Sequence, residues 1–269
     1  MREIPFIIAN AFADQPFSGN QCAVCITQEW LVDAEMRALA AEFATSASAF
    51  VVPVDDSFAI RWFAPSGREI ELCGHGTIAA AHVLFETTVH SGDTLILRTE
   101  RTSLLVGRSD PEVWMTMPAG AVESVADPSI LAKALGGRIP PRAWKGRDYV
   151  AVFDDASTVQ ALSPDRDALR QIDAYALVVT APGGPDDEAD YVARFFKSDR
   201  PDCEDPVNGA SQAFAAPLWA RLLQRTELRV RQLSKRGGRM RCRVDEDGVT
   251  VSARAFSAMR GKVYLTSVG

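Results

Sequence analysis

The feature that most constrains this chain is a pattern that occurs twice. In each half, strand-like segments lead into a turn, a glycine and an alanine-rich stretch with helical character. Gly76 precedes one such stretch at 77–86, and Gly209 precedes the other at 212–223. About half of the 269 residues separate the two glycines. A glycine before a helix is common in α+β proteins, but the shared alanine-rich helix and flanking strands favour an internal duplication at domain scale.

Apolar periodicity predicts five helices and a larger number of strands. The helices are expected at 31–43, 77–86, 128–135, 167–172 and 212–223. The strands are expected at 4–10, 22–26, 49–54, 58–63, 69–72, 95–99, 103–108, 113–117, 148–153, 176–180, 191–196, 228–232, 240–244, 249–254 and 262–267. Three consecutive alanines at 79–81 leave little bulk on any face of their helix, so we expect it to lie deep among strands. The first clear boundary between the halves is the Met-Pro-Ala-Gly segment at 117–120.

Composition limits the class of protein. Apolar residues make up 47% and charged residues 24%, which is typical of a globular chain and not of a disordered one. The 29 basic and 35 acidic residues give a net charge of −6, which argues against nucleic acid or an anionic membrane surface as partner. No run approaches the ~20 apolar residues of a membrane span. The N-terminal segment predicts a first strand and not a signal peptide. Five scattered cysteines indicate reduced thiols in a cytoplasmic protein.

Both glycine loops suit the binding of a small anion. A loop that opens a helix presents free backbone N–H groups and the positive end of the helix dipole. Carboxylates and phosphates bind at such places. Two helix N-termini, one from each half, are expected to face a shared cleft that holds a small carboxylic acid. Neither loop matches a nucleotide-binding glycine motif, so no nucleotide is inferred.

Three residues in these loops carry candidate chemistry. Cys73 stands at the first helix opening, where a thiol is acidified and acts as base or nucleophile. His75, in the same loop, can supply a proton or a hydrogen bond near neutral pH. The alternatives are a small buried thiol and a capping or core histidine. Asp205, at the second helix opening, is either a turn residue or a carboxylate held over the cleft.

Other chemistry-bearing residues receive structural interpretations. His82, inside the alanine-rich helix, is expected to pack in the core, and His90 is expected to be exposed. Cys22 and Cys25 form a C-x-x-C pair, but no second pair stands at metal-binding spacing, so a zinc site is not favoured. The basic segment 235–241 is interpreted as a solvated hairpin, from which one side chain could reach a substrate carboxylate.

Four ordered blocks of this sequence resemble motifs of the PhzF-like (phenazine biosynthesis) family. They are N-A-F at 10–12 with P-F-S-G-N at 16–20, R-W-F-A-P at 61–65 with L-C-G-H-G-T at 72–77, E-D-P-V-N-G at 204–209, and S-K-R-G-G at 234–238. The blocks extend from the first predicted strand to the C-terminal hairpins, so the resemblance covers nearly the whole chain.

The resemblance implies an α+β fold of the diaminopimelate-epimerase type. Such a fold has two pseudo-symmetric domains, each a curved, mostly antiparallel sheet wrapped around a central helix, with the active site in the cleft between them. The corresponding domains here would be 1–117, completed by a C-terminal strand at about 256–269, and 118–255.

The resemblance also implies a reaction class. PhzF-like enzymes isomerise a dihydro-hydroxyanthranilate by moving a proton, and related epimerases and proline racemases use paired cysteines. We therefore expect a cofactor-independent isomerase or epimerase that moves a proton next to the carboxylate of a small cyclic or amino acid. The resemblance implies no cofactor, no metal and a homodimer.

Site residues transfer from the family one position at a time. His75 and Asp205 match the active-site histidine and aspartate, and Cys73 matches the cysteine of the first epimerase loop. The second epimerase cysteine falls on Pro206, so a two-thiol racemase is not expected. The predicted substrate-binding residues are Asn20, Ser46, Gly74, Gly76, Gly209, Ala210 and Ser211.

The main departure from the family is Ala47. The family has S-E-T-A-F-V at 46–51, and its glutamate, the general acid/base, falls on Ala47, which carries no proton. A family serine likewise falls on Ala210, with Ser211 displaced by one. Three accounts stay open: an engineered loss of the base, proton transfer by Cys73 with His75 or Asp205, or loss of catalysis that leaves a carboxylate-binding protein. A thiol-dependent lyase or hydrolase is less favoured, because no Cys-His-Asn order supports it.

Overall fold

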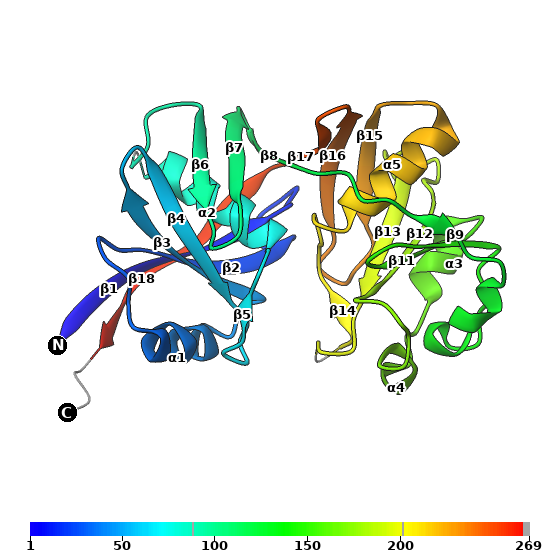
Figure 1. The fold of residues 1–269 in the computed structure, drawn as a ribbon, viewed down its shortest axis with the longest axis horizontal. Helices are drawn as coiled ribbons and strands as arrows, with labels where there is room; N and C mark the ends of the chain where they lie inside the picture. Colours follow the sequence, from blue (N-terminus) through cyan, green and yellow to red (C-terminus); the bar gives the residue numbers. More distant parts are fainter. Residues whose placement is uncertain (88, 201, 266–269) are drawn as a thin grey trace. The chain divides into compact units, whose positions relative to one another are not determined.

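The computed structural model describes residues 1–87, 89–200 and 202–265. The chain divides into two compact units. Unit 1 comprises Met1–Thr116 and Ser252–Gly269, and unit 2 comprises Met117–Val251. Figure 1 shows the chain coloured from blue at the N-terminus to red at the C-terminus, with the red β18 beside the blue β1 in unit 1.

Unit 1 contains nine strands and two helices within its described residues. The strands are β1 (Arg2–Ala11), β2 (Asn20–Ile26), β3 (Ala47–Val54), β4 (Ser57–Phe63), β5 (Glu69–Ile70), β6 (Thr94–Arg98), β7 (Ser103–Ser109), β8 (Glu112–Met117) and β18 (Ala255–Leu265), and the helices are α1 (Asp33–Phe43) and α2 (Gly74–Glu86).

Unit 2 is built from the same kinds of element. Its strands are β9 (Glu123–Ser124), β10 (Arg142–Lys145), β11 (Tyr149–Val152), β12 (Leu177–Pro182), β13 (Tyr191–Phe196), β14 (Glu204–Asp205), β15 (Glu227–Gln232), β16 (Gly238–Asp245) and β17 (Gly248–Ala253). Its helices are α3 (Ala156–Ala161), α4 (Arg166–Leu169) and α5 (Gln212–Leu223), with 3₁₀ turns η1 (Pro128–Leu131) and η2 (Lys133–Leu135).

The two units repeat one order of strand pairings. In unit 1, β1 is antiparallel to β2, β2 is parallel to β3, β3 is antiparallel to β4, β4 pairs with β5 and β6, and β6 is antiparallel to β7. In unit 2, β10, β11, β12, β13, β14, β15 and β16 repeat the same steps with the same directions. The predicted duplication and the α+β class are therefore confirmed.

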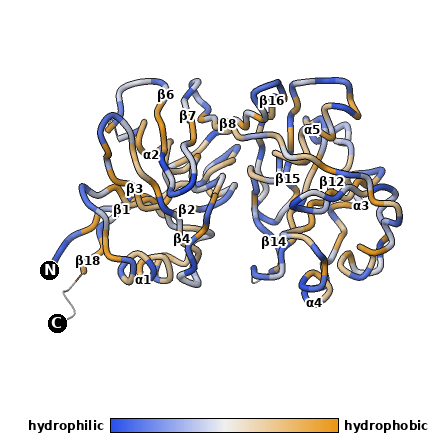
Figure 2. Tube along the Cα trace, viewed as in Figure 1, coloured by the Kyte–Doolittle hydropathy of each residue, from blue (hydrophilic) through white to orange (hydrophobic). Residues whose placement is uncertain are grey.

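The helix that follows the short strand is the deepest element of unit 1. Every residue of α2 from Gly74 to Phe85 is buried except His82, and the three alanines at 79–81 are fully buried. Small side chains allow the surrounding strands to approach closely, as the sequence predicts. In unit 2, α5 takes the equivalent place, with residues such as Ala215 and Ala216 fully buried. Figure 2 shows hydrophobic stretches along strands such as β3 in unit 1 and β12 in unit 2, and hydrophilic connecting turns.

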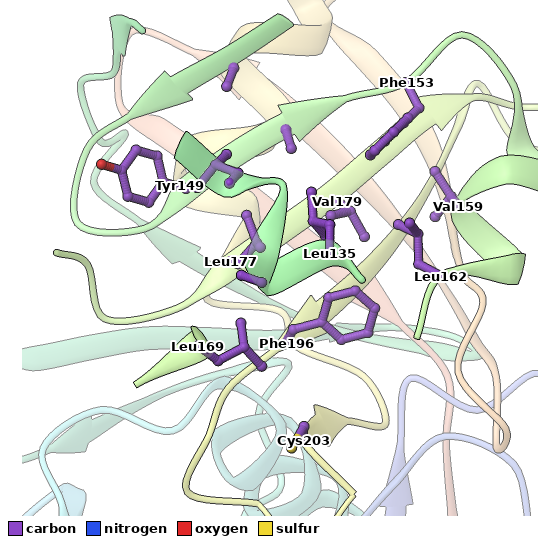
Figure 3. Packing of buried hydrophobic residues seen from close by; sticks show 14 of the residues in the cluster. Leu135, Tyr149, Phe153, Val159, Leu162, Leu169, Leu177, Val179, Phe196 and Cys203 are labelled. Atoms are coloured by element: carbon purple, nitrogen blue, oxygen red, sulfur yellow. The ribbon is translucent and has the colours of Figure 1, made fainter. Parts of the chain in front are cut away.

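The two faces of each sheet pack against different helices. In unit 1, Cys25, Phe50 and Phe63 form one cluster with Leu31, Met36, Leu39 and Ala40 around α1, so this face lies against α1. In unit 2, the equivalent cluster lies among strands β11, β12 and β13 and the helices α3 and α4, with Phe196, Leu177 and Val179 at its centre (Figure 3). The opposite face of each sheet is left for the central helix.

Several element boundaries differ from the sequence-based prediction. The first alanine-rich helix begins at Gly74 and not at residue 77, because two glycines with low helix propensity hide its first turn. The helix predicted at 128–135 is two 3₁₀ turns, and the one predicted at 167–172 ends at Leu169. Strands β9, β10 and β14 and helix α3 were not predicted. The last strand begins at Ala255, and residues 266–267 of its predicted range lie outside the described residues. None of the helices in the described ranges has the length and hydrophobicity of a membrane span.

Candidate active site

The first glycine loop forms the N-terminus of α2. Cys73 is its N-cap residue, with an extended backbone (φ −131°, ψ 97°). Its carbonyl accepts hydrogen bonds from the backbone N–H and the hydroxyl of Thr77, both at 2.8 Å. Gly74, His75 and Gly76 therefore occupy the first turn, whose N–H groups have no partner within the helix. The turn is the N-terminus of a helix of 13 residues, so the positive end of the helix dipole lies here.

Cys73 and His75 contact each other at this helix end. Sγ of Cys73 lies 3.5 Å from Nδ1 and 3.8 Å from Nε2 of His75. Both residues are buried, with exposed fractions of 5% and 6%. An imidazole in contact with a thiol can accept its proton and then stabilise the thiolate. The arrangement is thus able to transfer a proton.

Three other cysteines, Cys22, Cys25 and Cys242, have surroundings that oppose ionisation. All five cysteines are free thiols. Burial raises the pKa of Cys22 well above its usual value, with a further increase from the charge of Cys73. Burial raises the pKa of Cys25 to about 12 and also raises the pKa of Cys242. Cys22 and Cys25 point to opposite faces of β2, because they lie three residues apart in a strand. Within the described ranges, no group of three or more His, Cys, Asp or Glu side chains is placed to hold a metal ion.

Ala47, at the family's glutamate position, lies on the α2 side of the sheet. It is the first residue of β3 and is fully buried. It pairs with Cys22 across the parallel β2–β3 ladder, and Ala49 pairs with Trp62 across β3–β4. Paired residues and alternate residues share a face. Ala47, Cys22 and Trp62 therefore face away from α1 and toward α2, where Ala47 offers only a methyl group.

Asn20 and Ser46 lie at the same end of the β2–β3 pair as Ala47. Asn20 is the fully buried first residue of β2, and Ser46 is half-buried directly before β3. Thr45 holds this strand start in place: its hydroxyl donates to the carbonyl of Ala47 at 2.7 Å and accepts from the N–H of Ala23 at 3.3 Å. The structure thus brings these predicted residues of unit 1 together.

The second glycine loop forms the entry to α5. Three N–H groups, those of residues 212–214, donate to carbonyls three residues back, which makes a tight turn through Gly209 and Ala210. Ser211 points back into the loop: its N–H donates to Oδ1 of Asn208 at 2.8 Å and its hydroxyl donates to the carbonyl of Asn208 at 2.9 Å. The displaced serine therefore stabilises the loop, together with Asn208.

Both carboxylate oxygens of Asp205 accept hydrogen bonds. Oδ1 accepts a hydrogen bond from Nη2 of Arg200 within an ion pair, and Oδ2 accepts from Nδ2 of Asn208 at 2.8 Å. The side chain is 8% exposed. A carboxylate with a donor on each oxygen is fixed in orientation. This geometry suits Asp205 for positioning a polar group better than for carrying a proton.

A buried amide of β15 fixes the backbone of the same loop. Nε2 of Gln232 donates to the carbonyl of Asp205 at 3.0 Å, and its Oε1 accepts from the N–H of Asn208 at 3.0 Å. Gln232 is 1% exposed. One side chain thus satisfies two backbone groups of the loop that carries Asp205.

Replacing Gln232 with leucine is expected to lower the free energy of unfolding by about 2–4 kcal/mol, because two backbone groups lose their partners in a buried place. Urea unfolding followed by circular dichroism measures the change. Glu227→Gln, at the exposed start of the same strand, is the control and should change stability by less than about 0.5 kcal/mol. Equal changes in the free energy of unfolding would show that the hydrogen bonds of Gln232 do not stabilise the fold.

The S-K-R-G-G segment packs beside the Asp205 loop. The hydroxyl of Ser234 donates to the carbonyl of Pro206 at 2.6 Å, and Gly237 closes the hairpin with a positive φ of 64°. This confirms the predicted turn. Burial lowers the pKa of Arg236, a half-buried guanidinium in the same turn. That a basic residue of this segment reaches a substrate carboxylate stays a prediction.

Two histidines differ from their predicted environments. His82 is half-buried, not enclosed in the core: it lies 3.7 Å from the carboxylate of Glu86, and burial lowers its pKa. His90 is half-buried, not fully exposed, because its ring packs against Phe58 and Phe85. Neither belongs to the glycine loops, so neither joins the candidate site.

A cavity in unit 2 lies apart from the predicted residues. It has a volume of about 600 Å³ and is lined at the C-terminal end of α5 by residues such as Leu218, Arg221 and Gln224. The Gly209 loop is at the other end of this helix. None of the residues that line this cavity belongs to the candidate site.

Sequence reasoning missed four residues that border one or the other glycine loop. Asn208 is within a recognised motif, and Arg200 lies five positions before the aspartate, so both were accessible to inspection. Trp62 is likewise within a recognised motif, at 61–65. Gln232 joins the Asp205 loop only through strand pairing, and no local signal marks it.

Each unit wraps strands in the same order around a central helix that follows a glycine loop. This arrangement defines an α+β protein with an epimerase-like fold. A solved structure described as a probable proline racemase from Agrobacterium radiobacter shares this fold with a TM-score of 0.64 and 15% identity, covering 98% of this chain and 94% of that chain. The family model for phenazine biosynthesis-like proteins matches residues 9–262. The chain therefore belongs to the PhzC-PhzF family, as its motifs predict.

Closer relatives share most of their length with the chain. A Pseudomonas aeruginosa protein named as an uncharacterized isomerase is 36% identical over 263 residues, covering 98% of this chain and all of the relative. The crystal structure of a PhzF-family phenazine biosynthesis protein from Enterococcus faecalis has a TM-score of 0.92 and 35% identity, covering 98% of this chain and 100% of that one. Both relatives match the chain along both units.

Proposed function

We propose that this protein is a cofactor-independent isomerase that moves a proton at a carbon next to the carboxylate of a small cyclic or amino acid. The observation that carries the proposal is the contact of Cys73 with His75 at the N-terminus of α2. The name of the Pseudomonas aeruginosa relative supports isomerase activity in general. The substrate class comes from the chemistry of the two helix openings.

The proposed step begins with removal of a proton from the carbon. Cys73 as thiolate accepts it, and His75 holds or relays the proton of the thiol. The electron pair moves toward the carboxylate and gives an enolate-like anion, which the N–H groups at the start of α2 stabilise. The N–H groups at the start of α5 are proposed to have the same role. Return of the proton to another position or face of the substrate completes an isomerisation without net oxidation or reduction.

Asp205 has a positioning role in this proposal. Its two oxygens already accept hydrogen bonds from Arg200 and Asn208, so it orients a polar group of the substrate and does not exchange protons. Asn20 and Ser46, at the start of the β2–β3 pair, and the loop 209–211 are the further residues proposed to bind substrate. A homodimer in the cytoplasm is part of the proposal, supported by the five free cysteines for the compartment and by the family resemblance for the assembly.

A non-catalytic carboxylate-binding protein is the second candidate function. Ala47 supports it, because the family's acid/base position holds a methyl group here. The glycine loops would then bind a carboxylate without turnover. Ligand-induced stabilisation with no proton exchange is the pattern that this alternative predicts.

Proton exchange with solvent separates the two functions. Purified protein in D₂O is incubated with a panel of cyclic and amino carboxylic acids, and deuterium incorporation is followed by NMR. We expect exchange at the carbon next to the carboxylate for at least one acid, with no added cofactor. Stabilisation by acids without any exchange would favour the binding protein, and neither effect across the panel would contradict both functions.

A further inference from the structure

The indole of Trp62 has a buried donor that the fold does not use. Trp62 is 1% exposed, and its Nε1 has no hydrogen-bond partner among the residues that the structure describes. Leaving a buried N–H without an acceptor costs free energy, on the order of the loss of one hydrogen bond. Such a donor points to an acceptor that forms in another state of the site.

The unused donor lies against the first turn of α2. A Cβ placed on Gly76 would lie 2.6 Å from Cδ1 and 2.9 Å from Nε1 of Trp62, and 3.0 Å from Sγ of Cys73. The Nε1 edge of the indole and the sulfur of Cys73 thus border the same point of the helix, which a glycine leaves open. The β4–β5 pairing fixes this approach, because Trp62 pairs with Ile70 three residues before Cys73.

We propose that the Trp62 indole N–H is the donor that stabilises the thiolate of Cys73, which makes Trp62 a positioning residue for the proton carrier. In the thiol form, the sulfur is a poor acceptor and makes its contact with His75. When the proton leaves, the sulfur becomes a charged acceptor, and a small rotation about the Cys73 side chain directs it to Nε1. This inference deepens the proposed function, since it concerns how Cys73 ionises, and it is testable without any substrate.

The described groups around Cys73 show what an indole donor would add. His75, on α2, is the imidazole that takes the proton. Cys22, on β2, is a further titratable neighbour, and its own pKa is raised by burial and by the charge of Cys73, so it does not compete as an anion. From β3, Ala47 supplies no charge or donor. Among these groups, the helix N-terminus, His75 and Trp62 are the ones that can stabilise the buried thiolate.

The alkylation rate of Cys73 as a function of pH tests the proposal. The full chain is treated with iodoacetamide, and modification of the Cys73 peptide is followed by mass spectrometry, which separates it from the other cysteines. In Trp62→Phe, which keeps an aromatic ring but removes the donor, the midpoint of the rate profile should rise by about one pH unit. Below the midpoint, alkylation should be about tenfold slower than in the unchanged protein.

Trp219→Phe is the matched control, because Trp219 is also buried with an unpartnered Nε1 but lies on α5 in unit 2. This control should leave the Cys73 profile unchanged. An unchanged profile in folded Trp62→Phe, or the same shift in both variants, would overturn the proposal.

A second measurement needs no Trp62 variant in the tested protein. The ¹⁵N–¹H resonance of the Trp62 indole is followed with pH in the unchanged chain and in Cys73→Ala. We expect the resonance to shift along with the ionisation of Cys73 and to lose that titration in Cys73→Ala. A chemical shift that does not change with pH in either protein would contradict the inference. Because neither assay uses a carboxylic acid, failure here leaves the proton-transfer proposal standing, and failure of the exchange assay leaves this one standing.

Discussion

Replacing Cys73 with alanine is expected to reduce proton exchange by about 10²–10⁴-fold, the range that a positioned acid/base group contributes. The reason is that Ala47 removes the family's base, while Asp205 has both oxygens engaged by Arg200 and Asn208. Cys73, in contact with His75, is then the remaining candidate carrier of the described loops. The measurement is deuterium incorporation into the panel acid that exchanges fastest with the unchanged protein.

The matched control for this experiment is Cys25→Ala. Cys25 is also buried, but it faces α1 on the other side of the sheet, and its pKa is raised to about 12. This variant should keep its exchange rate within about twofold once its stability has been checked by thermal unfolding. If Cys73→Ala exchanges as fast as the unchanged protein, Cys73 is a structural thiol and the proposed carrier is wrong.

The fold was accessible from the sequence because its signals are local and occur twice. The alanine-rich helix α5 was predicted with its observed bounds, and the strand order of one unit repeats in the other. The errors have a physical cause as well. The start of α2 was placed three residues late, because Gly74 and Gly76 are poor helix formers that only burial and the Cys73 cap hold in a helix. Short strands such as β14 depend on a partner strand and have no signal of their own.

The residues of the candidate site also divide into those with a local sequence signal and those without one. Cys73, His75 and Asp205 lie in contiguous motifs and were identified, and the structure places the first two in contact. The residues that orient them come from elsewhere: Gln232 reaches the Asp205 loop from β15, and Trp62 reaches Cys73 from β4. Contacts of this kind are set by strand register and are not encoded in any short window of sequence.

Restoring the family's acid/base, Ala47→Glu, is expected to raise proton exchange by about 10²–10⁴-fold over the unchanged protein. Ala47 is the first residue of β3 and faces the side of the sheet on which α2 lies. A glutamate there would extend toward the helix opening that carries Cys73. The positive end of α2 favours its charged form, and this partly offsets the burial of a carboxylate.

Ala47→Gln is the control that distinguishes the effect of an ionisable group from the effect of a larger side chain. It adds nearly the same volume and the same reach, and both variants should lower the free energy of unfolding by about 1–3 kcal/mol, because Ala47 is fully buried. Only the glutamate can carry a proton, so only Ala47→Glu should gain exchange in the deuterium assay. The comparison works even where the unchanged protein is slow.

The outcome also decides between the two candidate functions. A gain in Ala47→Glu alone would show that the rest of the site, including the glycine loops and Asp205, is built for proton transfer. No gain in a variant that is folded and still stabilised by carboxylic acids would mean that the loss of the glutamate was accompanied by loss of the catalytic geometry. The second result would favour a carboxylate-binding protein that keeps the family fold, because binding needs a helix N-terminus but no acid/base.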